Sequence, residues 1–126
     1  MNYRNLLAVV FGVSLFVSVT SALAADLAKG AKVYKKCKVC HSLKEGGKHK
    51  IGPNLFGIMG RESGTAKGFK YSKAMKEAGV TWGVSPLTEY LTKPKDFIPG
   101  NKMAFPGLKK AEQIENIIAF LEANTK

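Results

Sequence analysis

The spacing of apolar residues after position 25 predicts a helix near the start of the chain. Asp26 is of a type that often caps a helix N-terminus. The residues that follow place Leu27, Gly30, Ala31 and Tyr34 at i, i+3, i+4 and i+7, which is one face of an α-helix. We expect this helix to run into Cys37.

A second amphipathic pattern predicts a helix from Lys110 to Ala123 at the other end of the chain. Its apolar positions form one stripe, made by Ile114, Ile117, Ile118 and Leu121. No residue at its start is a good side-chain cap. We expect the stripe to pack against the first helix.

Two shorter helices are predicted between these. Ser72 to Ala78 can form one helix, which Gly79 stops. Ser85 is the expected N-cap of the next, with Pro86 in its first turn and Pro94 ending it.

The stretch from Ser42 to Phe69 is interrupted by glycines at short intervals, which breaks every helical or strand period and predicts a loop. Loops of this length are uncommon in compact domains unless they wrap around something. We therefore expect an all-α domain in which helices and long loops surround a bound group.

Residues 1 to 24 carry the pattern of a secretory signal peptide. Arg4 precedes an apolar run from Leu6 to Val19, and Ala22-x-Ala24 is a typical cleavage site. Cleavage near Ala24 would leave one domain, residues 25 to 126, in the periplasm. An uncleaved membrane anchor is the alternative, although the run is short for a membrane span.

The chain is strongly basic, which predicts acidic partners. Its formal net charge is +11, and removal of Arg4 with the leader would leave +10. Nearly all the basic groups are lysines spread along the chain, and clustered arginines are lacking. We therefore expect no nucleic-acid binding and a monomer that docks on acidic protein surfaces.

The chemistry lies in Cys37-Lys38-Val39-Cys40-His41, a Cys-x-x-Cys-His haem attachment signature. Two thiols at this spacing can each bond a haem vinyl group, and imidazole is a suitable iron ligand. Three alternatives remain open at this point. They are a structural disulfide, a zinc site that also uses His49, and a thiol-disulfide oxidoreductase, whose strand pattern is missing.

The chain resembles class I cytochromes c, close to the mitochondrial and bacterial cytochrome c2 branch. The resemblance covers nearly all of residues 25 to 126. It rests on the following segments: Cys37-x-x-Cys40-His41, Gly52-Pro53-Asn54-Leu55-Phe56-Gly57 with Gly60-Arg61, Phe69-x-Tyr71-Ser72, Thr81-Trp82, Tyr90-Leu91 and Pro99-Gly100-Asn101-Lys102-Met103-Ala104-Phe105.

The resemblance implies one haem c, bound covalently through Cys37 and Cys40, with His41 and Met103 as the iron ligands. The carbonyl of Pro53 is expected to accept a hydrogen bond from the His41 ring. Tyr90 is expected near the Met103 sulfur.

The resemblance also implies donors to the haem propionates, namely Arg61, Tyr71, Trp82 and Asn101. Met75 departs from the pattern, because many relatives carry a polar Asn there. The first and last helices are expected to meet through Gly30, Tyr34 and Phe120.

The function implied is that of an electron carrier and not an enzyme. It would shuttle electrons between a membrane-bound donor such as a cytochrome bc1-type reductase and a cytochrome oxidase or photosynthetic reaction centre. Lys36, Lys50, Lys95 and Lys102 are the candidate steering lysines. Two other classes are a haem enzyme or sensor with a labile sixth ligand and a haem-free redox or metal-binding module.

Overall fold

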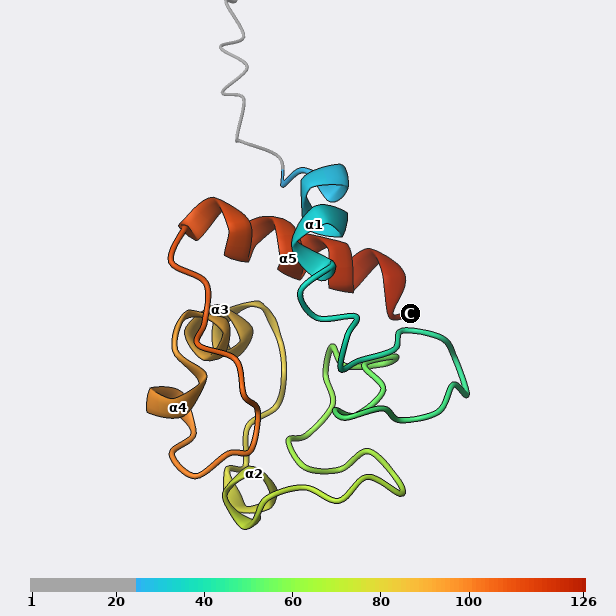
Figure 1. The fold of residues 1–126 in the computed structure, drawn as a ribbon, viewed down its shortest axis with the longest axis vertical. Coiled ribbons are helices and arrows are strands. Elements are labelled where there is room, and N and C mark those ends of the chain that lie inside the picture. The colour runs from blue at the N-terminus through green and yellow to red at the C-terminus, as the bar shows by residue number, and fades with distance from the viewer. Residues whose placement is uncertain (1–24) are drawn as a thin grey trace, which may run out of the picture.

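The structure is a computed structural model that describes residues 25 to 126, so the predicted leader and its cleavage site at Ala24 lie outside the described residues. The described part of the chain forms five helices joined by long loops (Figure 1). Its only extended pairing is an isolated antiparallel bridge between Glu62 and Thr81. The all-α prediction is confirmed.

Helices α1 (Leu27–Tyr34) and α5 (Ala111–Asn124) cross and pack against each other, as predicted (Figure 1). A side chain on Gly30 would put its Cβ 2.2 Å from the backbone oxygen of Asn116, so glycine allows the close crossing. The rings of Tyr34 and Phe120 lie beside it with centroids 5.3 Å apart.

The predicted ends of these helices are nearly correct. Asp26 caps α1 by accepting a 3.0 Å hydrogen bond from the Lys29 N–H. The helix ends at Tyr34, three residues before the expected Cys37, and the chain continues in tighter turns. As expected, α5 begins without a side-chain cap.

The stripe of isoleucines on α5 is buried and forms much of the core. Ile117 is 1% exposed, and the rest of the stripe is buried with it. Helix α3 contributes Leu87 and Tyr90 to the same core. Burial of such side chains stabilises the fold by about 1.5–3 kcal/mol each, so the α1–α5–α3 unit is the scaffold that carries the loops.

The middle of the chain differs from the prediction at two points. Helix α3 (Val84–Thr92) begins at Val84 with Gly83 as its N-cap, so Ser85 is not the cap. Pro86 is tolerated as the third residue because first-turn N–H groups have no partner in the helix. Helix α2 (Lys73–Glu77), capped by the Ser72 side chain, agrees with the prediction.

Pro94 does end α3, but it also begins a short helix that was not predicted, α4 (Pro94–Phe97). Proline fits the first position of a helix because its missing N–H would have no partner there. Helices α3 and α4 flank one side of the molecule, and the loops between residues 42 and 69 occupy the other (Figure 1).

No helix within residues 25 to 126 has the length and apolar character needed to cross a bilayer.

Candidate haem-binding site

The attachment segment follows α1 in a hydrogen-bonded turn. The N–H groups of Cys40 and His41 both donate to the Cys37 carbonyl, at 3.0 and 2.9 Å. The Tyr34 hydroxyl donates to the carbonyl of His41 at 3.1 Å. Both thiols are free and partly buried. Burial raises the pKa of Cys37 to about 11, so this thiol is protonated at neutral pH.

The His41 ring is held in one orientation with one nitrogen left free. Its Nδ1 lies 2.7 Å from the carbonyl oxygen of Pro53, which can only accept, so Nδ1 carries the proton. The predicted contact with Pro53 is confirmed. Burial lowers the pKa of His41, which favours the neutral ring. Its Nε2 therefore presents a lone pair, as a metal ligand must.

Gly52 makes room for this ring. A Cβ on Gly52 would lie 2.4 Å from Cε1 of His41 and 2.7 Å from Nδ1, closer than real Cβ contacts come. The Gly52 N–H donates to the Cys40 carbonyl at 2.8 Å, so the loop that carries Pro53 is tied to the attachment turn.

The segment around Met103 lies beside a cluster of aromatic rings. The Tyr90 hydroxyl points at the Met103 sulfur, 3.7 Å away, which agrees with the expected proximity. Burial raises the pKa of Tyr90 to about 12, so this group is a neutral donor at physiological pH. The Trp82 ring packs on Tyr90 with a centroid distance of 5.0 Å.

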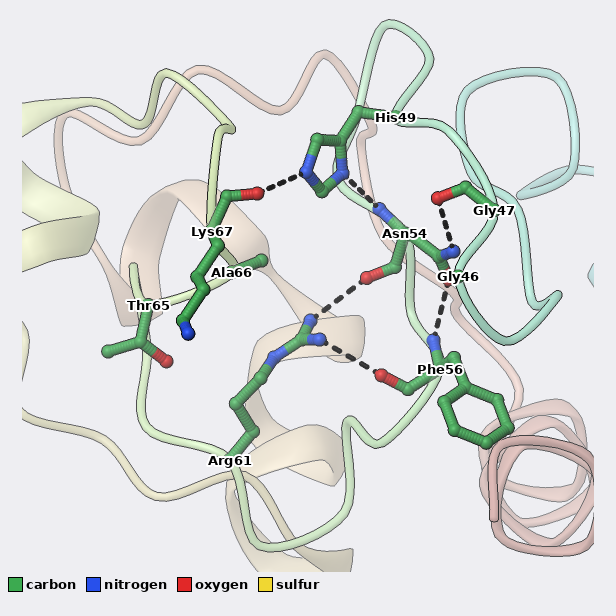
Figure 2. A pocket seen from close by; sticks show the side chains of 9 residues that line it. All are labelled: Gly46, Gly47, His49, Asn54, Phe56, Arg61, Thr65, Ala66 and Lys67. Carbon is green, nitrogen blue, oxygen red and sulfur yellow. Dashed lines mark hydrogen bonds between the residues drawn. The ribbon is translucent and has the colours of Figure 1, made fainter.

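Arg61 lies among loop carbonyls (Figure 2). Its guanidinium donates to the carbonyls of Phe56 and Asn54 at 3.1 and 3.2 Å. Its own carbonyl accepts from the Trp82 N–H at 2.9 Å, which brings two of the expected propionate donors together.

Two other expected propionate donors are used locally. The Tyr71 hydroxyl accepts from the Ala66 N–H at 3.2 Å, which leaves its own proton available. Asn101 is 3% exposed, and its amide is bonded to carbonyls of its own region. The role of all four residues at a propionate stays a prediction.

His49 and Asn54 have structural roles that the sequence did not indicate. The His49 Nδ1 accepts from the Asn54 N–H at 2.9 Å, and Nε2 lies 2.8 Å from the Lys67 carbonyl (Figure 2). The pocket beside them has a volume of about 370 Å³ and is also lined by Arg61 and Lys67. For Asn54 a usable signal was overlooked, namely its place after Gly52-Pro53, since Asn commonly orders turns.

The geometry bears on the alternatives for Cys37 and Cys40. The two thiols are not joined to each other. Within residues 25 to 126 no three His, Cys, Asp or Glu side chains gather as a metal site would require. His49 uses both ring nitrogens in loop contacts, so it is not placed beside the thiols as a zinc ligand.

The surface next to the attachment turn combines lysines with two exposed apolar side chains. Val39 and Ile51 are 65% and 80% exposed. Lys36 and Lys50 are exposed here, and the Lys50 ammonium contacts the Lys38 carbonyl. The other two candidate steering lysines, Lys95 and Lys102, are exposed near Met103 in the sequence.

The residues present fit a covalently held haem. Two thiols, a neutral imidazole with a free Nε2 and a partly buried thioether are the donors that such a group takes. Several apolar side chains packed against the core are only partly buried, so an apolar group could cover them further: Leu55, Met59, Leu91 and Phe105.

Comparisons with known proteins agree with this chemistry. The family model described as cytochrome c matches residues 27–125. The chain is 59% identical to cytochrome c of Chlamydomonas reinhardtii, over 82% of this chain and 94% of that protein. It is 46% identical to cytochrome c2 of Blastochloris viridis, over 90% of each.

A solved structure also matches. Cytochrome cH from Methylobacterium extorquens superposes with a TM-score of 0.73 at 38% identity, covering 78% of this chain and 98% of that one. The chain therefore belongs to the class I cytochrome c family, and it is an electron-transfer protein, not an enzyme, with Cys37 and Cys40 as the pair that attaches haem c.

Proposed function

We propose that His41 and Met103 are the axial ligands of the haem iron and that the chain is a periplasmic one-electron carrier. The observation that carries the ligand assignment is the hydrogen bond from His41 Nδ1 to Pro53, because it leaves Nε2 as a lone-pair donor. The Tyr90 hydroxyl in turn faces the Met103 sulfur and orients a soft thioether donor.

Haem supplies the one-electron chemistry, and a thioether ligand favours the ferrous state and so raises the potential. The chain's own residues fix the ligands and exclude water. Pro53 and Gly52 hold the imidazole, and buried Trp82 and Tyr90 close the site on the Met103 side. With His41 and Met103 both bound to the iron, no coordination position would remain for a substrate.

We propose that the carrier moves between a cytochrome bc1-type reductase and a cytochrome oxidase or photosynthetic reaction centre. Support comes from the net charge, +11 for the full chain and +10 without the leader, which exposed lysines mostly carry. Val39 and Ile51 add an apolar centre to the lysine surface at the attachment turn. The signal-like pattern of residues 1 to 24 supports export to the periplasm.

Carbon monoxide binding tests the ligand assignment. In the reduced wild type Met103 should block the iron, whereas Met103→Ala should bind carbon monoxide readily. Equal binding by both proteins would mean that Met103 is not a firm ligand, which favours the haem enzyme or sensor class. A colourless periplasmic protein would favour the haem-free class.

Ionic strength tests the docking proposal. The rate of electron transfer from a purified bc1-type complex should fall steeply as salt rises. Lys50→Glu should slow it at low salt, while Lys70→Glu, with the same charge change at another exposed loop position, should have a smaller effect. A rate independent of salt would contradict the steering role of the lysines.

A further inference from the structure

Every polar group of the buried Asn101 has a partner in the chain. Its amide nitrogen donates to the carbonyls of Pro94 and Ile98 at 2.7 and 2.8 Å, and its side-chain oxygen accepts from the Met103 N–H at 3.0 Å. Its backbone N–H donates to Ile98, and its carbonyl accepts from the Lys95 ammonium. A side-chain amide has two hydrogens, and both are used.

We propose that Asn101 is a positioning residue that fixes the segment carrying Met103, in place of the propionate donor that the family resemblance implies. To donate to a propionate, the amide would have to give up a bond to Pro94 or Ile98. Each carbonyl would keep one backbone partner, since Pro94 also accepts from the Ile98 N–H and Ile98 from the Asn101 N–H. Both residues are buried, so loss of the second bond would still cost free energy, because water does not replace it there.

The three side-chain bonds connect the Met103 backbone to both ends of α4. Pro94 is the first residue of this helix, and Ile98 follows its last residue. Because α4 packs on α3, which also carries Tyr90, the same frame sets both Met103 and the hydroxyl that faces its sulfur. Asn101 therefore determines where the thioether lies relative to the rest of the site.

Asn54 makes the same set of bonds in the loop that carries Pro53. Its amide nitrogen donates to the carbonyls of Lys44 and Gly47 at 2.7 and 2.9 Å, and its oxygen accepts from the N–H two residues later, that of Phe56, at 2.8 Å. It adjoins Pro53, the partner of His41. Asn54 is thus a control with the same bonds, placed next to the partner of His41 and away from Met103 in the sequence.

The inference deepens the proposed function and rests on Met103 as a ligand. A segment held by three hydrogen bonds would keep the thioether near a bound iron, so small external ligands would displace it less easily. Loss of those bonds should let an external ligand replace the thioether more easily without removing Met103 itself.

The test is a titration of the purified ferric holoprotein with imidazole, read by the weak red absorption band that a sulfur ligand gives to ferric haem. Asn101→Ala should lose this band at an imidazole concentration about tenfold lower than wild type, the effect expected from losing buried amide hydrogen bonds. Asn101→Ser keeps an acceptor for the Met103 N–H and should fall between the two. Asn54→Ala should titrate as wild type does.

The outcomes separate the inference from the proposed function. Wild type without the red band refutes Met103 ligation and with it this inference. A wild-type band with an unchanged titration in Asn101→Ala refutes the positioning role alone. An equal shift in Asn101→Ala and Asn54→Ala indicates general loosening and also refutes it. If Asn101→Ala does not fold, the shift in Asn101→Ser decides.

Discussion

Replacing Gly52 with alanine tests how the His41 ring is held. The new Cβ would lie 2.4 Å from Cε1 and 2.7 Å from Nδ1 of His41. Carbon atoms pack at about 3.5–4.0 Å, so the ring or the loop has to move by about 1 Å. Such a movement stretches the 2.7 Å hydrogen bond from Nδ1 to Pro53 beyond its useful range.

The magnitude follows from two costs. Overpacking a tight site costs about 1–3 kcal/mol, and a lost hydrogen bond adds about 1 kcal/mol. We therefore expect Gly52→Ala to lower the free energy of unfolding by about 2–4 kcal/mol. The displaced imidazole should also bind the iron less well.

Equilibrium unfolding of the holoprotein in urea measures the loss, and the NMR signal of the Nδ1 proton reports its hydrogen bond to Pro53. Gly57→Ala is the control, because its Cβ would meet nothing within 4 Å although its φ is 71°. It should cost about 1–2 kcal/mol in backbone strain and leave the Nδ1 signal unchanged. Wild-type stability with an unshifted Nδ1 signal in Gly52→Ala would refute the reasoning.

Three further substitutions test other parts of the structure. Gly30→Ala gains about 1 kcal/mol of helix propensity, but its Cβ would lie 2.2 Å from the Asn116 backbone oxygen, and this clash should lower the free energy of unfolding by more than that gain. A higher stability of the variant in urea would contradict the close crossing of the two helices. Tyr90→Phe removes the O–H that faces the Met103 sulfur, which leaves the sulfur lone pairs more available to the iron and stabilises the ferric state. The reduction potential measured by redox titration should therefore fall by up to about 60 mV. A rise in the potential would contradict this role of Tyr90. The hydrogen bond from the Lys29 N–H lowers the pKa of Asp26 below 3.8, so the charged Asp26 stabilises the fold above that value, and this contribution is lost as pH falls through the folded-state pKa. Asp26→Asn keeps the cap without the charge, so the melting temperature of the variant should vary less with pH below about 4 than that of the wild type. Melting temperatures that fall in parallel for the two proteins would contradict this.

Local patterns predicted the scaffold well. The Asp26 cap and the isoleucine stripe each act within one helix, so residue type and period were enough to locate α1 and α5. Helix α4 was missed because Pro94 both ends one helix and begins the next, and the sequence signal for the two is the same.

The contacts that shape the site were harder to predict, because they join residues through the fold. The resemblance supplied the pairs of His41 with Pro53 and of Tyr90 with Met103. It did not supply the bonds of Asn101, whose partners Pro94 and Ile98 are set by how α4 is placed. Residue type also did not show that His49 joins the loops at Asn54 and Lys67.

The pair of axial ligands is the central claim, and X-ray absorption at the iron edge tests it most directly. For the purified holoprotein we predict a single sulfur scatterer among nitrogens in both the ferric and the ferrous state, lost in Met103→Ala. A first shell of nitrogen and oxygen alone in the wild type would contradict ligation by Met103.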